Sequence, residues 1–132
     1  MNNIKKLAIA LLFFVAVPMS AQSALDKWPA MKDFHEVLSR SYHPTEENNF
    51  EPLRNFSQTL ADKAMELSTK EVPRDIKTEA LMKAVARLQV QSQEVNKLVK
   101  TNASNETLKK AITETHDIFH EIIGMCTAEK KR

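Results

Sequence analysis

Histidine and sulfur side chains are the residues of this 132-residue sequence whose types and spacing could do chemistry. His116 and His120 are four residues apart, and so are Met31 and His35. Side chains at positions i and i+4 project from the same side of a helix. Imidazole suits copper, zinc and nickel, whereas the methionine thioether and the thiolate of Cys126, the only cysteine, favour cuprous ion. The pattern predicts a transition-metal site that takes copper or zinc.

Each of these residues also has an interpretation in which it binds no metal. The His-x-x-x-His stretch lacks the glutamate placement that marks the helix of zinc proteases. His35 could be a satisfied residue at the edge of the core, His120 a solvent-facing one, and the methionines gap fillers between helices. Cys126 could be buried, joined to a second chain in a homodimer, or a ligand. His43, which precedes Pro44, is expected to cap a helix end and is left out of the site.

The chain that must position these residues is expected to be all-α. It has one glycine, and its apolar residues recur every three to four positions, which is the helical period. A first helix should stop before His43-Pro44, because the residue before a proline is pushed out of helical dihedrals. The predicted helices cover residues 25–42, 50–69, 75–100 and 105–126. Short connections and a near-heptad apolar seam predict an antiparallel, up-down-up-down four-helix bundle.

This topology would place the candidate ligands at one level of the bundle. The chain reverses at every loop and each helical residue rises about 1.5 Å, so the start of the first helix lies opposite the end of the last. Met31 is expected near the height of His120, and His35 near the height of His116. The first and last helices would then each present two potential ligands to one shared patch.

The N-terminal segment reads as a cleavable secretory signal over residues 1–23, followed by one domain over residues 24–132. Lys5 and Lys6 supply the positive start, and cleavage could follow either Ala21 or Ser23. The apolar run over residues 7–19 is too short for a hydrocarbon layer that needs roughly 20 residues. We therefore expect a periplasmic protein, or a secreted one if the source is eukaryotic, whose mature chain does not insert into a membrane.

The charge balance argues against nucleic acid as a partner. Removal of the leader takes Lys5 and Lys6 from the 19 Lys and Arg residues and nothing from the 17 Asp and Glu residues. The mature chain would then carry 17 residues of each sign and no net charge. A protein that neutralises phosphates needs an excess of basic residues, usually gathered on one face.

In its length, export and four helices, with a methionine near the start of the first and a histidine near the end of the last, the chain resembles the soluble periplasmic b-type cytochromes and their cytochrome c prime relatives. The resemblance implies haem b with Met31 and His120 as axial ligands, although His116 could replace His120. The c-type attachment motif Cys-x-x-Cys-His is absent from the sequence. Small residues near the same level could leave room for a porphyrin, namely Ala61, Ala64, Ala80 and Ala84.

Three functions from different classes follow from these observations. The leading hypothesis is a periplasmic protein that binds a transition-metal ion. The second is a haem-b electron carrier, and the third is a helical adaptor or stress-response protein whose histidines bind nothing. An enzyme ranks last, because no nucleophile with an adjacent base is identifiable. The residues of the leading hypothesis are His35, His116 and His120, with Met31 and Cys126 as sulfur donors.

Overall fold

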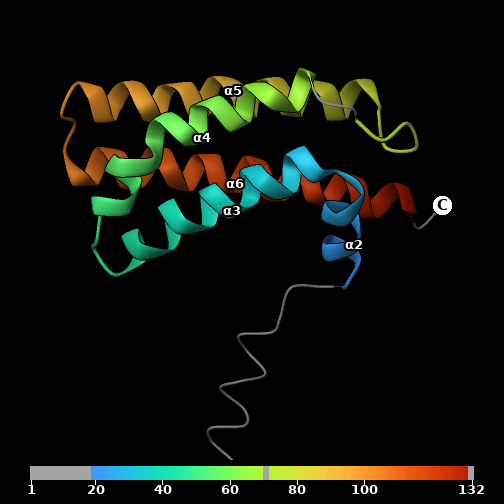
Figure 1. The fold of residues 1–132 in the computed structure, drawn as a ribbon, viewed down its shortest axis with the longest axis horizontal. Coiled ribbons are helices and arrows are strands. Elements are labelled where there is room, and N and C mark those ends of the chain that lie inside the picture. The colour runs from blue at the N-terminus through green and yellow to red at the C-terminus, as the bar shows by residue number, and fades with distance from the viewer. Residues whose placement is uncertain (1–18, 70–71, 131–132) are drawn as a thin grey trace, which may run out of the picture.

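The computed structural model describes residues 19–69 and 72–130, which contain five α-helices and no strand (Figure 1). The predicted all-α class is therefore confirmed. Most of the predicted leader, residues 1–18, lies outside the described residues. In the described part, no helix is both long enough and apolar enough to cross a membrane. The helices are α2 (Met19–Lys27), α3 (Pro29–Glu46), α4 (Glu51–Thr69), α5 (Glu79–Lys100) and α6 (Asn105–Lys130).

A break at Trp28 separates α2 from α3, so the single helix predicted over residues 25–42 is wrong at its start. Pro29 is the first residue of α3 and holds Trp28 outside the helical region, at φ −127° and ψ 81°. Proline is tolerated at this position because the first N–H groups of a helix have no partner within it. Trp28 is buried together with Ala24 and Leu25 of α2, so all three residues contribute to the core.

The end of α3 also differs from the prediction, because the helix continues two residues beyond Pro44. Proline has no N–H to donate to the carbonyl four residues earlier, and α3 ends only two residues after it. The Thr45 hydroxyl donates to the Tyr42 carbonyl at 2.6 Å, and the Glu47 N–H donates to the Pro44 carbonyl at 3.0 Å. These bonds complete the last turn. His43 is consequently a residue of the helix and not its end cap.

The remaining helices lie close to their predicted ranges. α5 begins four residues later than predicted, because Thr78 is its N-cap and its hydroxyl accepts a hydrogen bond from the Leu81 N–H at 3.1 Å. α6 does not end near Cys126 but extends to Lys130. Gly124 lies inside α6 without interrupting it. The thiol of Cys126 is therefore held within a continuous helix.

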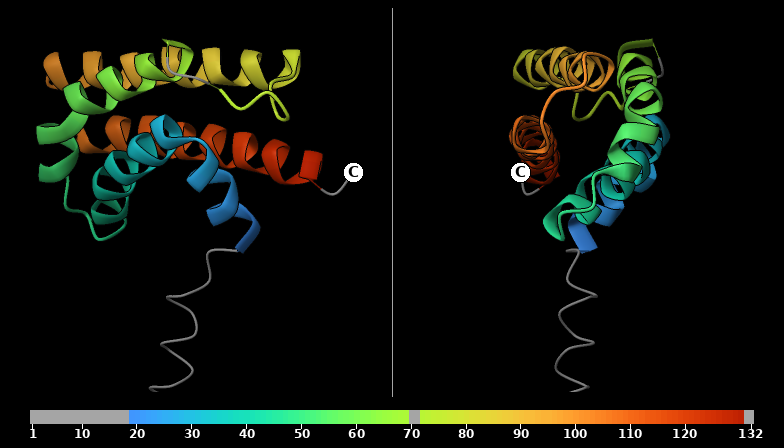
Figure 2. Two further views of the ribbon diagram at one scale, coloured as in Figure 1. Left: turned by 45° about the vertical axis from the view of Figure 1, so that its right-hand side comes forward. Right: turned by 90° about the vertical axis from the view of Figure 1, so that its left-hand side faces the viewer.

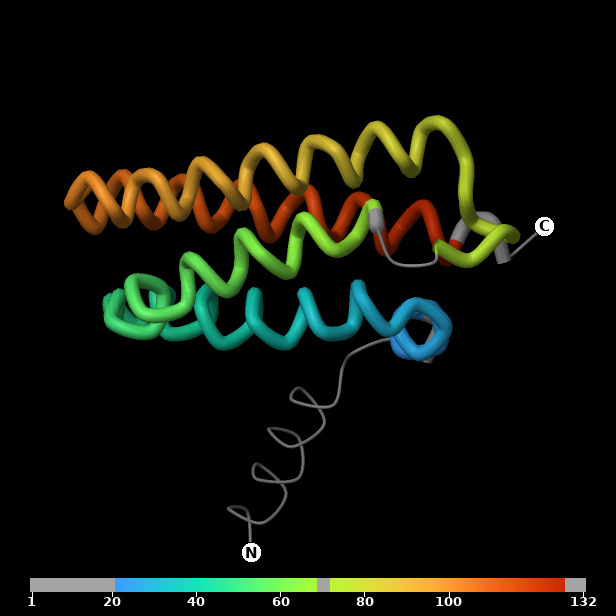
Figure 3. The backbone as a smooth tube through the Cα atoms, turned by 45° about the horizontal axis from the view of Figure 1, so that its top comes forward, coloured from blue at the N-terminus to red at the C-terminus, as the bar shows by residue number. Residues whose placement is uncertain are grey.

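Consecutive long helices reverse direction and pack against each other. In Figure 1, α3 and α5 run from right to left, whereas α4 and α6 run from left to right, and Figure 3 traces the same path. α3 packs closely on α4, α4 on α5 and α5 on α6, whereas α3 and α6 approach each other less closely. Figures 1 and 2 show α3 and α6 diverging toward the C-terminal end of α3. Large side chains fill the core, among them Phe34, Leu38, Leu60, Leu88 and Ile112.

The contacts between helices differ in kind from one pair to the next. In the α4–α5 pair, the Ser57 hydroxyl donates to the Asn96 side-chain oxygen at 3.0 Å. In the α5–α6 pair, the Gln91 amide donates to the Ala111 carbonyl at 3.1 Å. Across the α3–α6 contact, aromatic and imidazole rings pack against each other. We call this contact the α3–α6 seam.

Candidate metal centre

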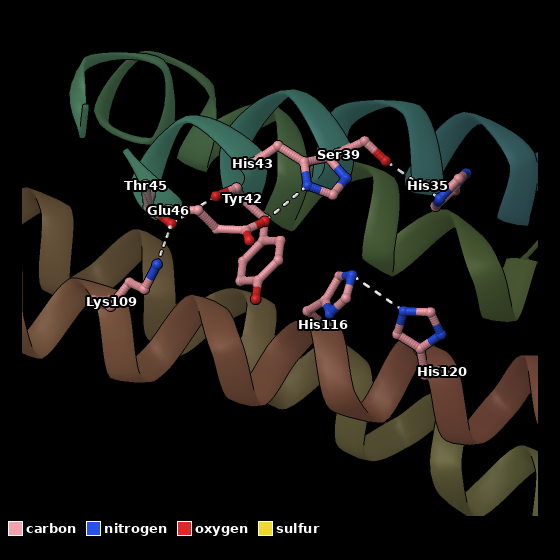
Figure 4. Close-up of polar contacts among 9 residues, drawn as sticks. All are labelled: His35, Ser39, Tyr42, His43, Thr45, Glu46, Lys109, His116 and His120. Atoms are coloured by element: carbon pink, nitrogen blue, oxygen red, sulfur yellow. Dashed lines mark hydrogen bonds and ion pairs between the residues drawn. The ribbon is translucent and has the colours of Figure 1, made fainter. Parts of the chain in front are cut away.

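His116 and His120 of α6 form the closest pair of potential metal ligands at the α3–α6 seam (Figure 4). Their Nε2 atoms lie 3.1 Å apart, and their ring centroids lie 4.3 Å apart at an interplanar angle of 75°. His116 is partly buried and His120 is exposed. Because the two residues are one helical turn apart, α6 alone is sufficient to set this geometry.

α3 contributes rings that fix the orientation of His116. The Tyr42 ring stacks on His116 with centroids 4.1 Å apart and an angle of 14°. His43 meets His116 edge to face at a centroid distance of 6.2 Å. The four histidines of the chain therefore gather at one seam, and we call His35, His43, His116 and His120 the histidine cluster.

His43 is the member of the cluster that sequence reasoning missed. Its Nδ1 lies 3.0 Å from Oε1 of Glu46, one turn further along α3. The signal that could have found it is the spacing from His35, because residues eight apart lie two turns apart on similar faces of a helix. The prediction ended the helix before His43-Pro44 and so treated His43 as the end cap of the helix.

His35, the histidine ligand predicted on α3, contacts Phe119 and Ser39 and not the histidines of α6. Its ring stacks on Phe119 with centroids 4.7 Å apart and an angle of 8°. Its Nε2 lies 3.2 Å from the Ser39 hydroxyl oxygen. The structure thus brings His35 to the seam, but the predicted height is wrong, because His35 lies against Phe119 and it is Tyr42 that lies against His116.

Burial and mutual repulsion favour the neutral form of two imidazoles in the cluster. The pKa of His116 is lowered to about 4, first because burial penalises the charged ring and then because His120 and His43 repel a proton. The pKa of His35 is lowered by the same causes in the same order. A metal ion binds the unprotonated ring nitrogen. At neutral pH, these two side chains therefore keep the lone pairs that coordination requires.

The two predicted sulfur donors lie in the hydrophobic core and not with the exposed part of the cluster. Met31 and Cys126 are each 1% exposed. The pKa of the Cys126 thiol is raised to about 11, first by burial and then by the nearby charge of Asp75. A buried, protonated thiol is neither a ready metal ligand nor a reactive group. It also cannot pair with a second chain unless this part of α6 opens.

The two predicted haem ligands lie in different environments. Met31 is buried, whereas His120 is exposed. Of the four small residues expected to leave room for a porphyrin, three are buried and one is exposed. The buried ones are Ala61, Ala64 and Ala84, and the exposed one is Ala80.

Coordination beyond the α6 pair requires side chains to move. Within residues 19–69 and 72–130, no three His, Cys, Asp or Glu side chains are already grouped to hold a metal ion. Comparisons with protein-family models, curated proteins and solved structures gave no match. They therefore do not bear on the resemblance to periplasmic cytochromes, and functional inference rests on the geometry of the seam.

Proposed function

We propose that this protein binds a transition-metal ion, zinc or copper, through the histidine cluster at the α3–α6 seam. The observation that carries the proposal is the 3.1 Å distance between Nε2 of His116 and Nε2 of His120. Two nitrogens bound to one tetrahedral zinc at 2.0–2.1 Å lie about 3.3 Å apart. Small rotations of the two rings would therefore let both nitrogens hold one ion.

The surroundings of this pair also support metal binding over core packing. The 3.1 Å separation of the two nitrogens is a hydrogen bond in the metal-free protein, and it is also close to the separation of two ligands on one ion. His120 is exposed, His43 is exposed, and the neutral form of His116 is favoured by its low pKa. A cation could therefore reach this surface without first opening the core.

The proposal includes the architecture and location of the protein. We infer that the four long helices form an antiparallel, up-down-up-down four-helix bundle, and that the bundle is released from an exported precursor into the periplasm. The helix directions in Figure 1 and the short connections between helices support this topology. The composition of residues 1–23 supports export.

The test replaces His116 and His120 together by Ala in the full chain and measures zinc and copper affinity by isothermal titration calorimetry. Affinity should fall at least about 100-fold, because even the loss of an outer-shell partner costs 10–100-fold. Metal should raise the melting temperature of the unsubstituted protein, because it binds the folded site better than the unfolded chain. The double variant should lose this rise.

The matched control changes another exposed i, i+4 pair. Glu36 and Arg40 of α3 form an ion pair at 2.9 Å, and replacing both by Ala should leave metal binding unchanged. If the histidine double variant keeps its affinity, or if metal stabilises nothing, the proposal is wrong and a helical adaptor becomes the better hypothesis. An intense Soret band in protein isolated from its native source would instead support a haem-b carrier.

A further inference from the structure

We propose that His43 is the third ligand of the ion, bound through its Nε2, and that Glu46 is the positioning residue that orients it. This inference rests on the proposed metal-binding function and names further residues of the same site. It changes the predicted ligand set, in which His35 and Met31 were the donors from α3 and His43 had no role.

The contact between His43 and Glu46 fixes which ring nitrogen faces the ion. Nδ1 of His43 lies 3.0 Å from Oε1 of Glu46. A carboxylate oxygen accepts hydrogen bonds and does not donate them. Nδ1 of His43 must then carry the proton and donate it to the hydrogen bond, which leaves the lone pair on Nε2. Metal-binding histidines commonly donate their second N–H to a carboxylate in this way.

The position of His43 suits a ligand that joins the α6 pair. Its ring faces His116 from across the seam, as Figure 4 shows, with centroids 6.2 Å apart. A third nitrogen must come within about 3.3 Å of the other two to share a tetrahedral ion. Because the His43 and Glu46 side chains are both exposed and lie on the same helical turn, rotation of the side chains can close this distance without repacking the core.

His35 is a poorer third ligand than His43 for a structural reason. To reach the ion, it would have to leave the Phe119 stack at 4.7 Å and the Ser39 hydroxyl at 3.2 Å. His43 is exposed, and its neighbours are the Glu46 carboxylate at 3.0 Å, the Tyr42 ring at 5.5 Å and the His116 ring at 6.2 Å. The cost of reorganisation therefore favours His43.

The ligand set also selects the class of ion. Three imidazole nitrogens, with no sulfur donor, suit a borderline divalent cation such as Zn²⁺ or Cu²⁺ over cuprous ion. The carboxylates of Glu46 and Asp117 act on the cluster at close range and favour a cation, although Lys109 also lies near Glu46. The exposed side of the seam leaves the fourth coordination position to water.

The experiment uses the full chain with Zn²⁺ affinity and Cu²⁺ electron paramagnetic resonance as its two measurements. Pulsed spectra of the Cu²⁺-loaded protein should count three imidazoles, and His43→Ala should reduce the count to two and weaken Zn²⁺ binding at least tenfold. Glu46→Gln should weaken Zn²⁺ binding by about 10–100-fold while the count stays at three. Glu47→Gln removes the same charge from the neighbouring exposed residue and should leave affinity within twofold.

Four outcomes would overturn the inference. His43→Ala could retain affinity and the original imidazole count, or His35→Ala could cause the loss in its place; in either case metal binding by the α6 pair would still stand. Equal effects of Glu46→Gln and Glu47→Gln would show that Glu46 acts only through bulk charge. If the unsubstituted protein binds neither Zn²⁺ nor Cu²⁺, the proposed function fails together with this inference.

Discussion

His116 is a partly buried histidine of the α3–α6 seam. Its ring lies between Tyr42 of α3 and His120 of α6, and its pKa is lowered to about 4. The unfolded chain should titrate this group near the ordinary value of about 6.5. Folding therefore holds a neutral ring at a pH where the unfolded chain would take up a proton.

The stability of the metal-free protein should depend on pH for this reason. Between pH 6.5 and about 4, the unfolded chain binds more protons at His116 than the folded protein, so the free energy of unfolding should fall as the pH falls. His35, whose pKa is also lowered, acts in the same direction. Urea denaturation at pH 7.5, 6.5, 5.5 and 4.5 would measure the slope.

His116→Phe tests the assignment, because phenylalanine keeps a ring against Tyr42 but has no proton to bind. Between pH 6.5 and 4.5, the free energy of unfolding should fall less in the variant than in the parent protein. At pH 7.5, where His116 is neutral in both states, a difference between the two proteins reports only the change in packing. An identical slope in both proteins would contradict the role of His116.

Sequence reasoning found three of the four histidines at the seam and missed the fourth. His116 and His120 were identifiable because helical spacing alone brings them together, and no tertiary information is needed. His43 was missed because a local rule about the residue before proline outweighed the helix that continues through Pro44. The burial of Cys126 could not be predicted either, because the sequence placed this residue near a helix end, whereas α6 extends beyond it.

At the scale of elements, capping decides where α5 begins. Thr78 adopts an extended conformation, and its hydroxyl accepts from the Leu81 N–H at 3.1 Å. Thr78→Ala should lower the free energy of unfolding by about 1 kcal/mol, because one N–H at the helix start loses its partner. Thr78→Ser keeps the hydroxyl and should retain most of the stability. Equal losses in both variants, measured by chemical denaturation, would show that the cap contributes nothing.

The positions of the long helices were largely predictable, and their ends were less so. A continuous 3.6-residue period marks the helix interiors regardless of tertiary context. Ends depend on competition between local signals, and the two prolines of α3 show opposite outcomes. Pro29 starts the helix, whereas Pro44 is accommodated within its last turn. The prediction overlooked the first and gave the second too much weight.

At the scale of the whole molecule, the seam joins segments that are far apart in the chain. α3 is the first long helix and α6 is the last, so their contact closes the largest loop among the packed pairs of long helices. Contacts between segments that are far apart in the chain have the greatest entropic cost of loop closure, and they tend to form late in folding. The neighbouring pairs, which are close in sequence, can form without them.

Because the α3–α6 contact is expected to form late in folding, an ion bound there should affect the rate of unfolding. An ion held by both α3 and α6 would stabilise a contact that is absent from the folding transition state, so it should slow unfolding and leave the folding rate nearly unchanged. Stopped-flow measurements with and without Zn²⁺ would show this as a shift of the unfolding limb alone. A protein built this way would fold equally fast with or without its metal, and only the metal-bound form would gain a longer lifetime against proteolysis and unfolding.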